Sequence, residues 1–206
     1  MSTLLAISAV IAAPSQYAGC DISAASMPMP ANQTQLTLPS GALSFIALGV
    51  GVQNYTCSSA GNYTNIGAVA EVFDISCLYG TPAFHSIQNT AYDVWDKAPP
   101  SMTAQSVISM LSDLPVKMWD FTSAAYAGNA AAYAVGAKTG DMVSPDGAVD
   151  VDWLQLKVVK GALASTVYRM NTVAGQLPGS CSPGDTTVQS VKYTSKYYFF
   201  GGSIKQ

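Results

Sequence analysis

The chain has 206 residues, of which 49% are hydrophobic and only 10% are charged. It therefore has the length and composition of one folded domain with a sizeable core, and it cannot be a disordered chain. Nine Lys and Arg against 12 Asp and Glu give a net charge of −3. Because binding to phosphates needs a basic surplus, no nucleic-acid partner is expected.

Residues 1–13 resemble a secretory signal peptide, since an apolar run from Leu4 to Ala13 precedes Pro14. An apolar N-terminal strand or tail is the alternative interpretation. The run has about half of the roughly 20 residues that a membrane-spanning helix needs, and no later apolar stretch reaches that length. We therefore expect no membrane span.

Residues 14–39 are rich in Pro, Ser, Ala and polar side chains, which predicts an extended lead-in held by Cys20. Residues 40–206 are predicted to form a single β-rich domain. Its first strand is expected over Leu43–Cys57, where an apolar, β-prone run passes into regular alternation.

A polar turn over residues 58–62 leads to a second expected strand, Ala68–Cys77. Side chains at every second position of this segment share one face: Val69, Glu71, Phe73 and Ile75. The first two strands are predicted to form a hairpin.

A short helix is predicted between His85 and Lys97, ended by Pro99 and Pro100. Its apolar residues fall at i, i+4, i+7 and i+8: Ile87, Ala91, Val94 and Trp95. A weaker helical pattern covers residues 101–114.

The remaining β-prone segments are separated by Gly, Pro, Asn and Asp. They cover residues 116–121, 131–138, 149–159, 163–171 and 188–200. For residues 131–137 a helix is the alternative, since Ala favours helix. Because no long helices alternate with these strands, the predicted fold class is all-β: an antiparallel sandwich or barrel with one or two short helices.

Cysteines and sequons indicate an oxidising, extracellular compartment. The four cysteines, an even count without a CxxC pair, favour disulfides over a zinc site: Cys20, Cys57, Cys77 and Cys181. Three Asn-x-Thr sequons point the same way: Asn32, Asn54 and Asn62. We therefore expect a secreted glycoprotein, with all three disulfide connectivities open at this point.

The segment Gly49–Asn54 resembles the start of a dinucleotide-binding fingerprint, in which glycines let the backbone approach a pyrophosphate. Asn54 stands where the third glycine belongs, and a strand and turn follow instead of a helix. No nucleotide or other cofactor is expected.

His85 is the only histidine, so any catalytic triad or dyad would have to use it; a structural role near a helix start is the simpler interpretation. A carboxylate pair could come from Glu71 and Asp74, although their spacing places them on opposite faces of a regular strand.

Four aspartates lie within twelve residues: Asp141, Asp146, Asp150 and Asp152. Asp150 and Asp152 project to one face of a strand at period two, which is an arrangement for a carboxylate pair acting on a sugar. Oxygens of Asp146, Asp150 and Asp152 could also bind Ca²⁺, but the spacing does not match an EF-hand, and a polar loop is the favoured interpretation.

Several segments together resemble one known family: Phe45–Cys57 with its Gly-Val-Gln-Asn-Tyr-Thr-Cys motif, 66–78, 151–157, 168–178 and 192–200. This is the DUF3455 family of secreted fungal proteins with related bacterial forms, some labelled "malate dehydrogenase". The resemblance runs from about Leu36 to Gly201. It implies a secreted, β-rich protein without assigned catalytic residues, and it implies the disulfides Cys57–Cys181 and Cys20–Cys77. The failed fingerprint speaks against NAD-dependent malate dehydrogenase activity.

The sequence leads to a hypothesis of a secreted binding or surface-interaction module, with cell-wall carbohydrate or a cell-surface component as the partner. The first alternative is a hydrolase or lyase on polysaccharide that uses Glu71, Asp74, Asp150 and Asp152, with His85 as a further candidate. The second alternative is a structural wall or spore-coat component.

Overall fold

The computed structural model describes residues 20–103, 133–177 and 179–203, together with 106, 110, 129 and 131. The predicted signal peptide lies outside the described residues. So do the predicted strand over 116–121 and most of the weaker helical pattern over 101–114.

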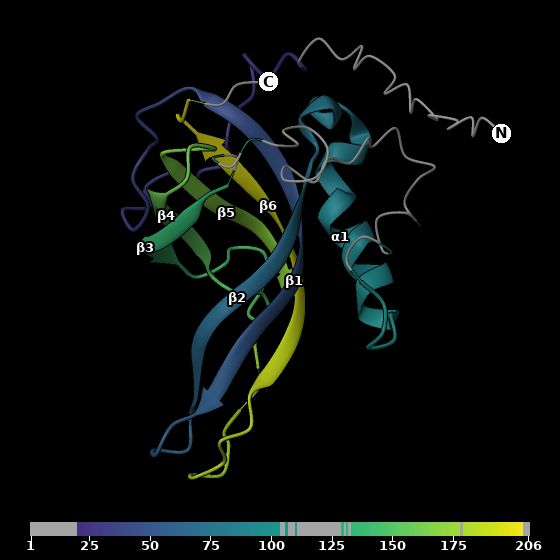
Figure 1. Ribbon diagram of the computed structural model, residues 1–206, viewed down its shortest axis with the longest axis vertical. Coiled ribbons are helices and arrows are strands. Elements are labelled where there is room, and N and C mark those ends of the chain that lie inside the picture. Colours follow the sequence, from purple (N-terminus) through teal and green to yellow (C-terminus); the bar gives the residue numbers. More distant parts are fainter. Residues whose placement is uncertain are drawn as a thin grey trace, which may run out of the picture.

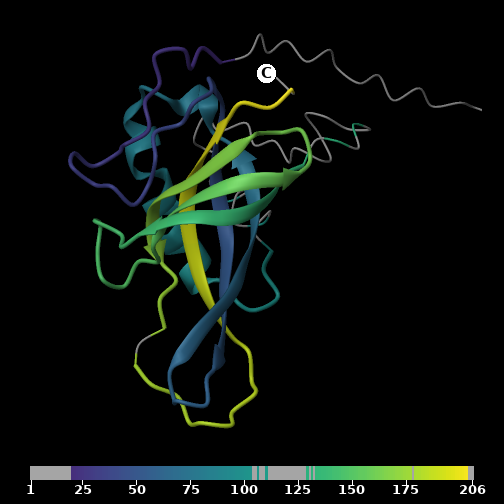
Figure 2. The same cartoon turned by 90° about the vertical axis from the view of Figure 1, so that its left-hand side faces the viewer.

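Six strands form one antiparallel sheet in the order β2-β1-β6-β5-β4-β3. They are β1 (Leu43–Cys57), β2 (Tyr63–Asp74), β3 (Val135–Met142), β4 (Trp153–Lys160), β5 (Thr166–Ala174) and β6 (Gln189–Phe200). The sheet curls into a half-barrel, and β1, β2 and β6 extend well beyond the shorter strands (Figures 1 and 2). The antiparallel all-β prediction is confirmed, with one helix and one 3-10 turn in the part of the chain that the structure describes.

Helix α1 (Pro82–Lys97) covers one face of the sheet, while β3 and β4 curl away on the other side (Figure 1). Alternation along β1 explains this division. Ile46, Leu48 and Val50 pack in one core with residues of α1, including Phe84 and Ile87. None of the described helices is long and apolar enough to cross a membrane.

The intervening odd-numbered residues of β1 lie on the opposite, concave face. Phe45 and Ala47 pack there with Val167 and Phe199 in a second, smaller cluster. Because β1 is buried on both faces, its sequence is a nearly continuous apolar run.

The predicted hairpin is confirmed, because β1 and β2 pair antiparallel from Ala47–Asp74 to Cys57–Tyr63.

Element boundaries differ from the prediction in two places near the first helix. The second strand ends at Asp74 and a 3-10 turn over Ser76–Leu78 follows, whereas the prediction carried the strand to Cys77. Helix α1 begins at Pro82 instead of His85, since the Thr81 hydroxyl caps it by accepting a hydrogen bond from the Phe84 N–H. A Thr-Pro pair at N-cap and N1 is a helix-start signal in its own right.

Two disulfides connect distant parts of the described chain, Cys20 with Cys77 and Cys57 with Cys181. This is the pairing that the family resemblance implied. The first holds the lead-in beside the helix-covered core, where Ile22 and Met27 pack. The second joins the tip of the β1–β2 hairpin to the segment that precedes β6.

Glycines of β1 allow the close approaches that curl the sheet. At Gly51 an added Cβ would lie 2.6 Å from the Ala70 Cα, inside any normal contact distance. At Gly49 an added Cβ would overlap the ring of Tyr197. The Gly49–Asn54 segment is thus the middle of a strand, paired on both sides, and its glycines make room for protein groups.

We expect Gly51→Ala to lower the free energy of unfolding by about 2 kcal/mol, because the new methyl group meets backbone that cannot move without breaking β1–β2 pairing. Gly49→Ala should cost less, since the far end of the Tyr197 ring can shift. Urea denaturation of both variants measures the difference. Equal stability of Gly51→Ala and the native protein would contradict this account of the curl.

Candidate functional site

The concave face of the sheet holds an open cavity of about 1330 Å³. Residues of β2 and β1 line one side, and residues of β3, β4 and β5 line the other. Helix α1 packs on the reverse side of the same sheet, so the cavity and the helix do not meet.

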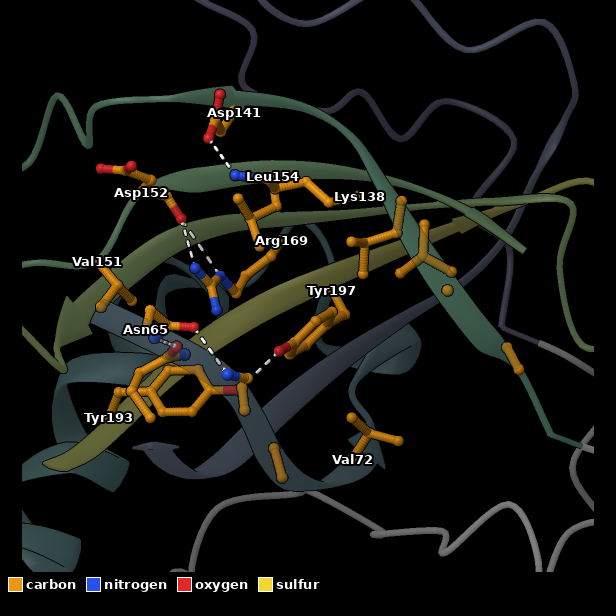
Figure 3. Close-up of a pocket in the computed structure, with 18 of the residues that line it drawn as sticks. Asn65, Val72, Lys138, Asp141, Val151, Asp152, Leu154, Arg169, Tyr193 and Tyr197 are labelled. Atoms are coloured by element: carbon orange, nitrogen blue, oxygen red, sulfur yellow. Dashed lines mark hydrogen bonds and ion pairs between the residues drawn. The ribbon is translucent and has the colours of Figure 1, made fainter. Parts of the chain in front are cut away.

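Arg169 of β5 lies on the floor of this cavity and is only 5% exposed. Its Nε and Nη2 atoms donate hydrogen bonds to the backbone carbonyl of Asp152, at 3.2 and 2.8 Å. The guanidinium also lies 5.5 Å from the centre of the Tyr193 ring, within cation–π range. Figure 3 shows Arg169 between Asp152 and Tyr193.

Arg169 has no carboxylate partner among the residues that the structure describes, where Lys138–Asp141 is the one ion pair. A buried charge without a counter-ion is costly, and hydrogen bonds to a carbonyl compensate only part of that cost. The cavity floor therefore carries a positive charge that a ligand could neutralise.

Two tyrosine hydroxyls extend this polar floor along β6. The Tyr193 and Tyr197 oxygens lie 2.8 Å apart and share a hydrogen bond. Burial raises the pKa of Tyr193 well above its ordinary value, and the neighbouring Tyr197 acts in the same direction. The Tyr193 hydroxyl therefore stays protonated at neutral pH and can donate.

A third polar group lies where β1 and β2 meet. Asn65 donates a hydrogen bond to the Gln53 side-chain oxygen at 2.9 Å, but the Gln53 Nε2 atom is buried without a hydrogen-bond partner in the described structure. Tyr55, close by, donates to the carbonyl of Gly175 at 2.7 Å. An amide donor on the cavity wall is thus left unsatisfied by the protein.

Asp152, Asp141, Lys138 and Glu71 also contribute charged groups to the lining. Burial raises the pKa of Asp152, and the negative charge of Asp141 adds to this effect, whereas Arg169 and Lys138 oppose it. In Figure 3 the Asp152 carboxylate points away from Arg169, and Asp141 is joined to Lys138.

Of the carboxylates proposed from the sequence, Glu71 and Asp152 line the cavity, whereas Asp74 and Asp150 do not. Glu71 pairs with Val50 and lines the cavity from β2, whereas Asp74 pairs with Ala47 and is not among the lining residues. Asp74 accepts a hydrogen bond from the Ser76 backbone N–H in the turn that follows. The structure therefore does not bring these two acids together as a pair.

The aspartates before β4 are also separated by their surroundings. Asp150 accepts a hydrogen bond from the Ala174 backbone N–H and does not line the cavity, whereas Asp152 does. Asp146 is exposed in the loop before them. Among the described residues, no group of three or more His, Cys, Asp or Glu side chains could hold a metal ion.

His85 lies on α1, on the side of the sheet opposite the cavity. Its side chain is exposed, and its ring contacts that of Phe84 at a centroid distance of 6.2 Å. The structure does not bring it near any of the candidate acids that line the cavity.

The three sequons differ in accessibility. Asn32 and Asn62 are exposed in turns, whereas Asn54 lies inside β1, half-buried, and accepts a hydrogen bond from the Ser190 hydroxyl at 2.7 Å. Asn32 and Asn62 therefore offer better access to a glycosylating enzyme.

Arg169, the central group of the cavity, is not among the site residues predicted from the sequence. It is the only arginine in the chain, and it lies in a predicted strand two residues after the apolar Val167 on the same face. A lone charge among inward-facing apolar residues is the signal that could have revealed it.

A family model described as "Protein of unknown function (DUF3455)" matches residues 39–201. A search of curated proteins finds no match, and a search of solved structures finds none either.

Proposed function

This chain belongs to the DUF3455 family of proteins of unknown function, and from that premise we propose that it is a secreted binding module that holds a ligand on the concave face of its sheet. The observation that carries the proposal is the cavity, whose floor holds the buried Arg169 without a carboxylate partner among the described residues. Concave sites lined mostly by apolar groups, with a few convergent polar groups, are the usual form of small-molecule sites.

Secretion is part of this proposal. Its support is the predicted signal peptide, the two disulfides and the exposed sequons at Asn32 and Asn62. Peptide mapping of protein recovered from the culture medium should find no free thiol, and glycans at these two sites but not at Asn54. Recovery of the chain only from inside cells, with free thiols, would contradict secretion.

Ligand binding is tested by thermal unfolding with a panel of oligosaccharides and small organic compounds. A ligand at about 100 times its Kd stabilises the folded state by about 2.7 kcal/mol, which should raise the Tm by about 5 °C or more. Analysis of products in the same samples distinguishes binding from hydrolysis or lysis of a polysaccharide.

A matched pair of variants ties binding to the cavity. Leu156 lines it, whereas Val159 of the same strand is exposed and does not. Leu156→Trp should remove the saturable Tm shift, and Val159→Trp should leave it unchanged. Equal shifts in both variants would place the ligand elsewhere, and shortened polysaccharide chains would favour the enzyme alternative.

A further inference from the structure

The cavity floor has more hydrogen-bond donors than the protein itself uses. A guanidinium has five N–H groups, of which Arg169 gives two to the Asp152 carbonyl, and it also interacts with the Tyr193 hydroxyl. Gln53 is only 2% exposed, and its Nε2 atom has no hydrogen-bond partner in the described structure. Tyr193 and Tyr197 share one hydrogen bond, which leaves one hydroxyl hydrogen available. The missing partner is therefore a hydrogen-bond acceptor.

The charge of the floor indicates how many negative charges that acceptor carries. Lys138 is already ion-paired with Asp141, so Arg169 is the one unpaired cation among the described residues that line the cavity. The carboxylates of Glu71 and Asp152 line it too, but that of Asp152 points away from Arg169 (Figure 3), and both disfavour a ligand with several negative charges. A single guanidinium fits one planar carboxylate with two parallel hydrogen bonds. A singly charged carboxylate matches the site better than a group with several negative charges.

The walls beside Arg169 are aliphatic. Leu154 of β4 pairs with Arg169 of β5. Two residues further along the same face of β4, Leu156 pairs with Val167. On the opposite side, Ala70 and Val72 of β2 face the cavity. A sugar that carries hydroxyls on all edges would leave some of them unsatisfied against such walls, whereas a hydrocarbon body would bury apolar surface.

We propose that the ligand of this cavity is an organic acid with an aliphatic body. Its carboxylate contacts Arg169, and its hydrocarbon part lies along Leu154, Leu156 and Val72. The proposal rests on the proposed function and names the ligand class for the same cavity.

The test compares decanoate with 1-decanol, which has the same chain length without the charge, by calorimetric titration of the full-length secreted protein below the micellar concentration. A charge-assisted hydrogen bond predicts that decanoate binds about 10-fold or more tightly than decanol. Arg169→Gln should lower the affinity for decanoate to that for decanol and leave decanol binding unchanged. Lys157→Gln, an equal charge change at an exposed position that does not line the cavity, should change neither affinity.

Equal affinities of the native protein for decanoate and decanol would overturn the role of the carboxylate while the binding function stands. Saturable binding of an oligosaccharide without binding of decanoate would overturn the ligand class and again leave the binding function standing. Failure of every compound in the panel would overturn the proposed function itself. The acid–alcohol comparison uses the native protein, so it decides the question even where Arg169→Gln does not fold.

Discussion

Replacement of both Cys57 and Cys181 by serine is expected to lower the free energy of unfolding by about 4–5 kcal/mol. The disulfide joins residues 124 positions apart and so closes a long loop in the unfolded chain. Without it the unfolded chain gains conformational entropy, which lowers the free energy of unfolding by about 4–5 kcal/mol. Guanidinium denaturation of the double variant measures the loss. For a domain whose total stability is on the order of 10 kcal/mol, it removes about half of the margin.

Removal of the Cys57–Cys181 disulfide should increase local opening most in the segment around Cys181, next to the end of the cavity that Tyr55 lines. The Cys181 backbone N–H donates to the Gly61 carbonyl at 2.9 Å, and the Tyr55 hydroxyl donates to the Gly175 carbonyl. Hydrogen exchange should therefore rise first in residues 179–189. The Cys20→Ser, Cys77→Ser double variant, which opens a loop of 57 positions, should lose about 0.7 kcal/mol less. A loss below about 1 kcal/mol at Cys57–Cys181 would contradict the prediction.

Lys196 should make the protein more stable as the pH rises above neutrality. This lysine of β6 is 3% exposed, and its Nζ lies 4.7 Å from the centre of the Phe84 ring of α1 and 3.4 Å from the His85 carbonyl. Burial lowers the pKa of Lys196 to about 8, although the negative charge of Asp146 acts in the opposite direction.

The direction of the effect follows from the two pKa values. In the unfolded chain Lys196 keeps its ordinary pKa of about 10.5, so between pH 8 and 10.5 the unfolded state binds the proton and the folded state does not. Stability therefore rises with pH in this window, and at pH 7 the buried charge costs about 3 kcal/mol. From pH 7 to pH 9.5 the gain should be about 2 kcal/mol.

Lys196→Met should abolish this gain and raise the stability at pH 7. Urea denaturation at intervals from pH 7 to pH 9.5 measures both effects. Tyrosines of the unfolded chain begin to ionise near pH 9.5 in both proteins alike, so the difference between the two curves isolates Lys196. Lys157→Met, at an exposed position of β4, serves as the control and should keep the pH-dependence of the native protein. The same pH-dependence in Lys196→Met and the native protein would rule out Lys196 as its source.

Short-range sequence patterns were sufficient for most strands and for the first hairpin. The apolar, β-prone run predicted a strand over Leu43–Cys57, and the structure shows its side chains alternating, with Ile46 and Leu48 in one core and Phe45 and Ala47 in the other. The errors lie at element ends. The third strand runs over Val135–Met142 instead of residues 131–138, because pairing with β4, and not local propensity, decides where it begins.

The candidate site was much harder to predict than the fold. Asp150 and Asp152 look like a pair in the sequence, yet hydrogen bonding directs Asp150 to the Ala174 backbone while Asp152 lines the cavity. Arg169, Tyr197 and Gln53 come from three strands far apart in the chain, and their convergence depends on the strand order and on the curl of the sheet. No spacing rule within one segment describes such a set.

The fold class, the β1–β2 hairpin and the presence of disulfides could be predicted from the sequence. They depend on composition, on alternation and on the even number of cysteines, which are local or additive properties of the chain. The concave cavity and its unpaired guanidinium belong to the tertiary structure alone. The curl depends on the close contact of Gly51 with β2, and the burial of Arg169 depends on the side chains that its neighbouring strands present. Contacts between residues more than 100 positions apart, such as that of Tyr55 with Gly175, arise only when the whole sheet has formed.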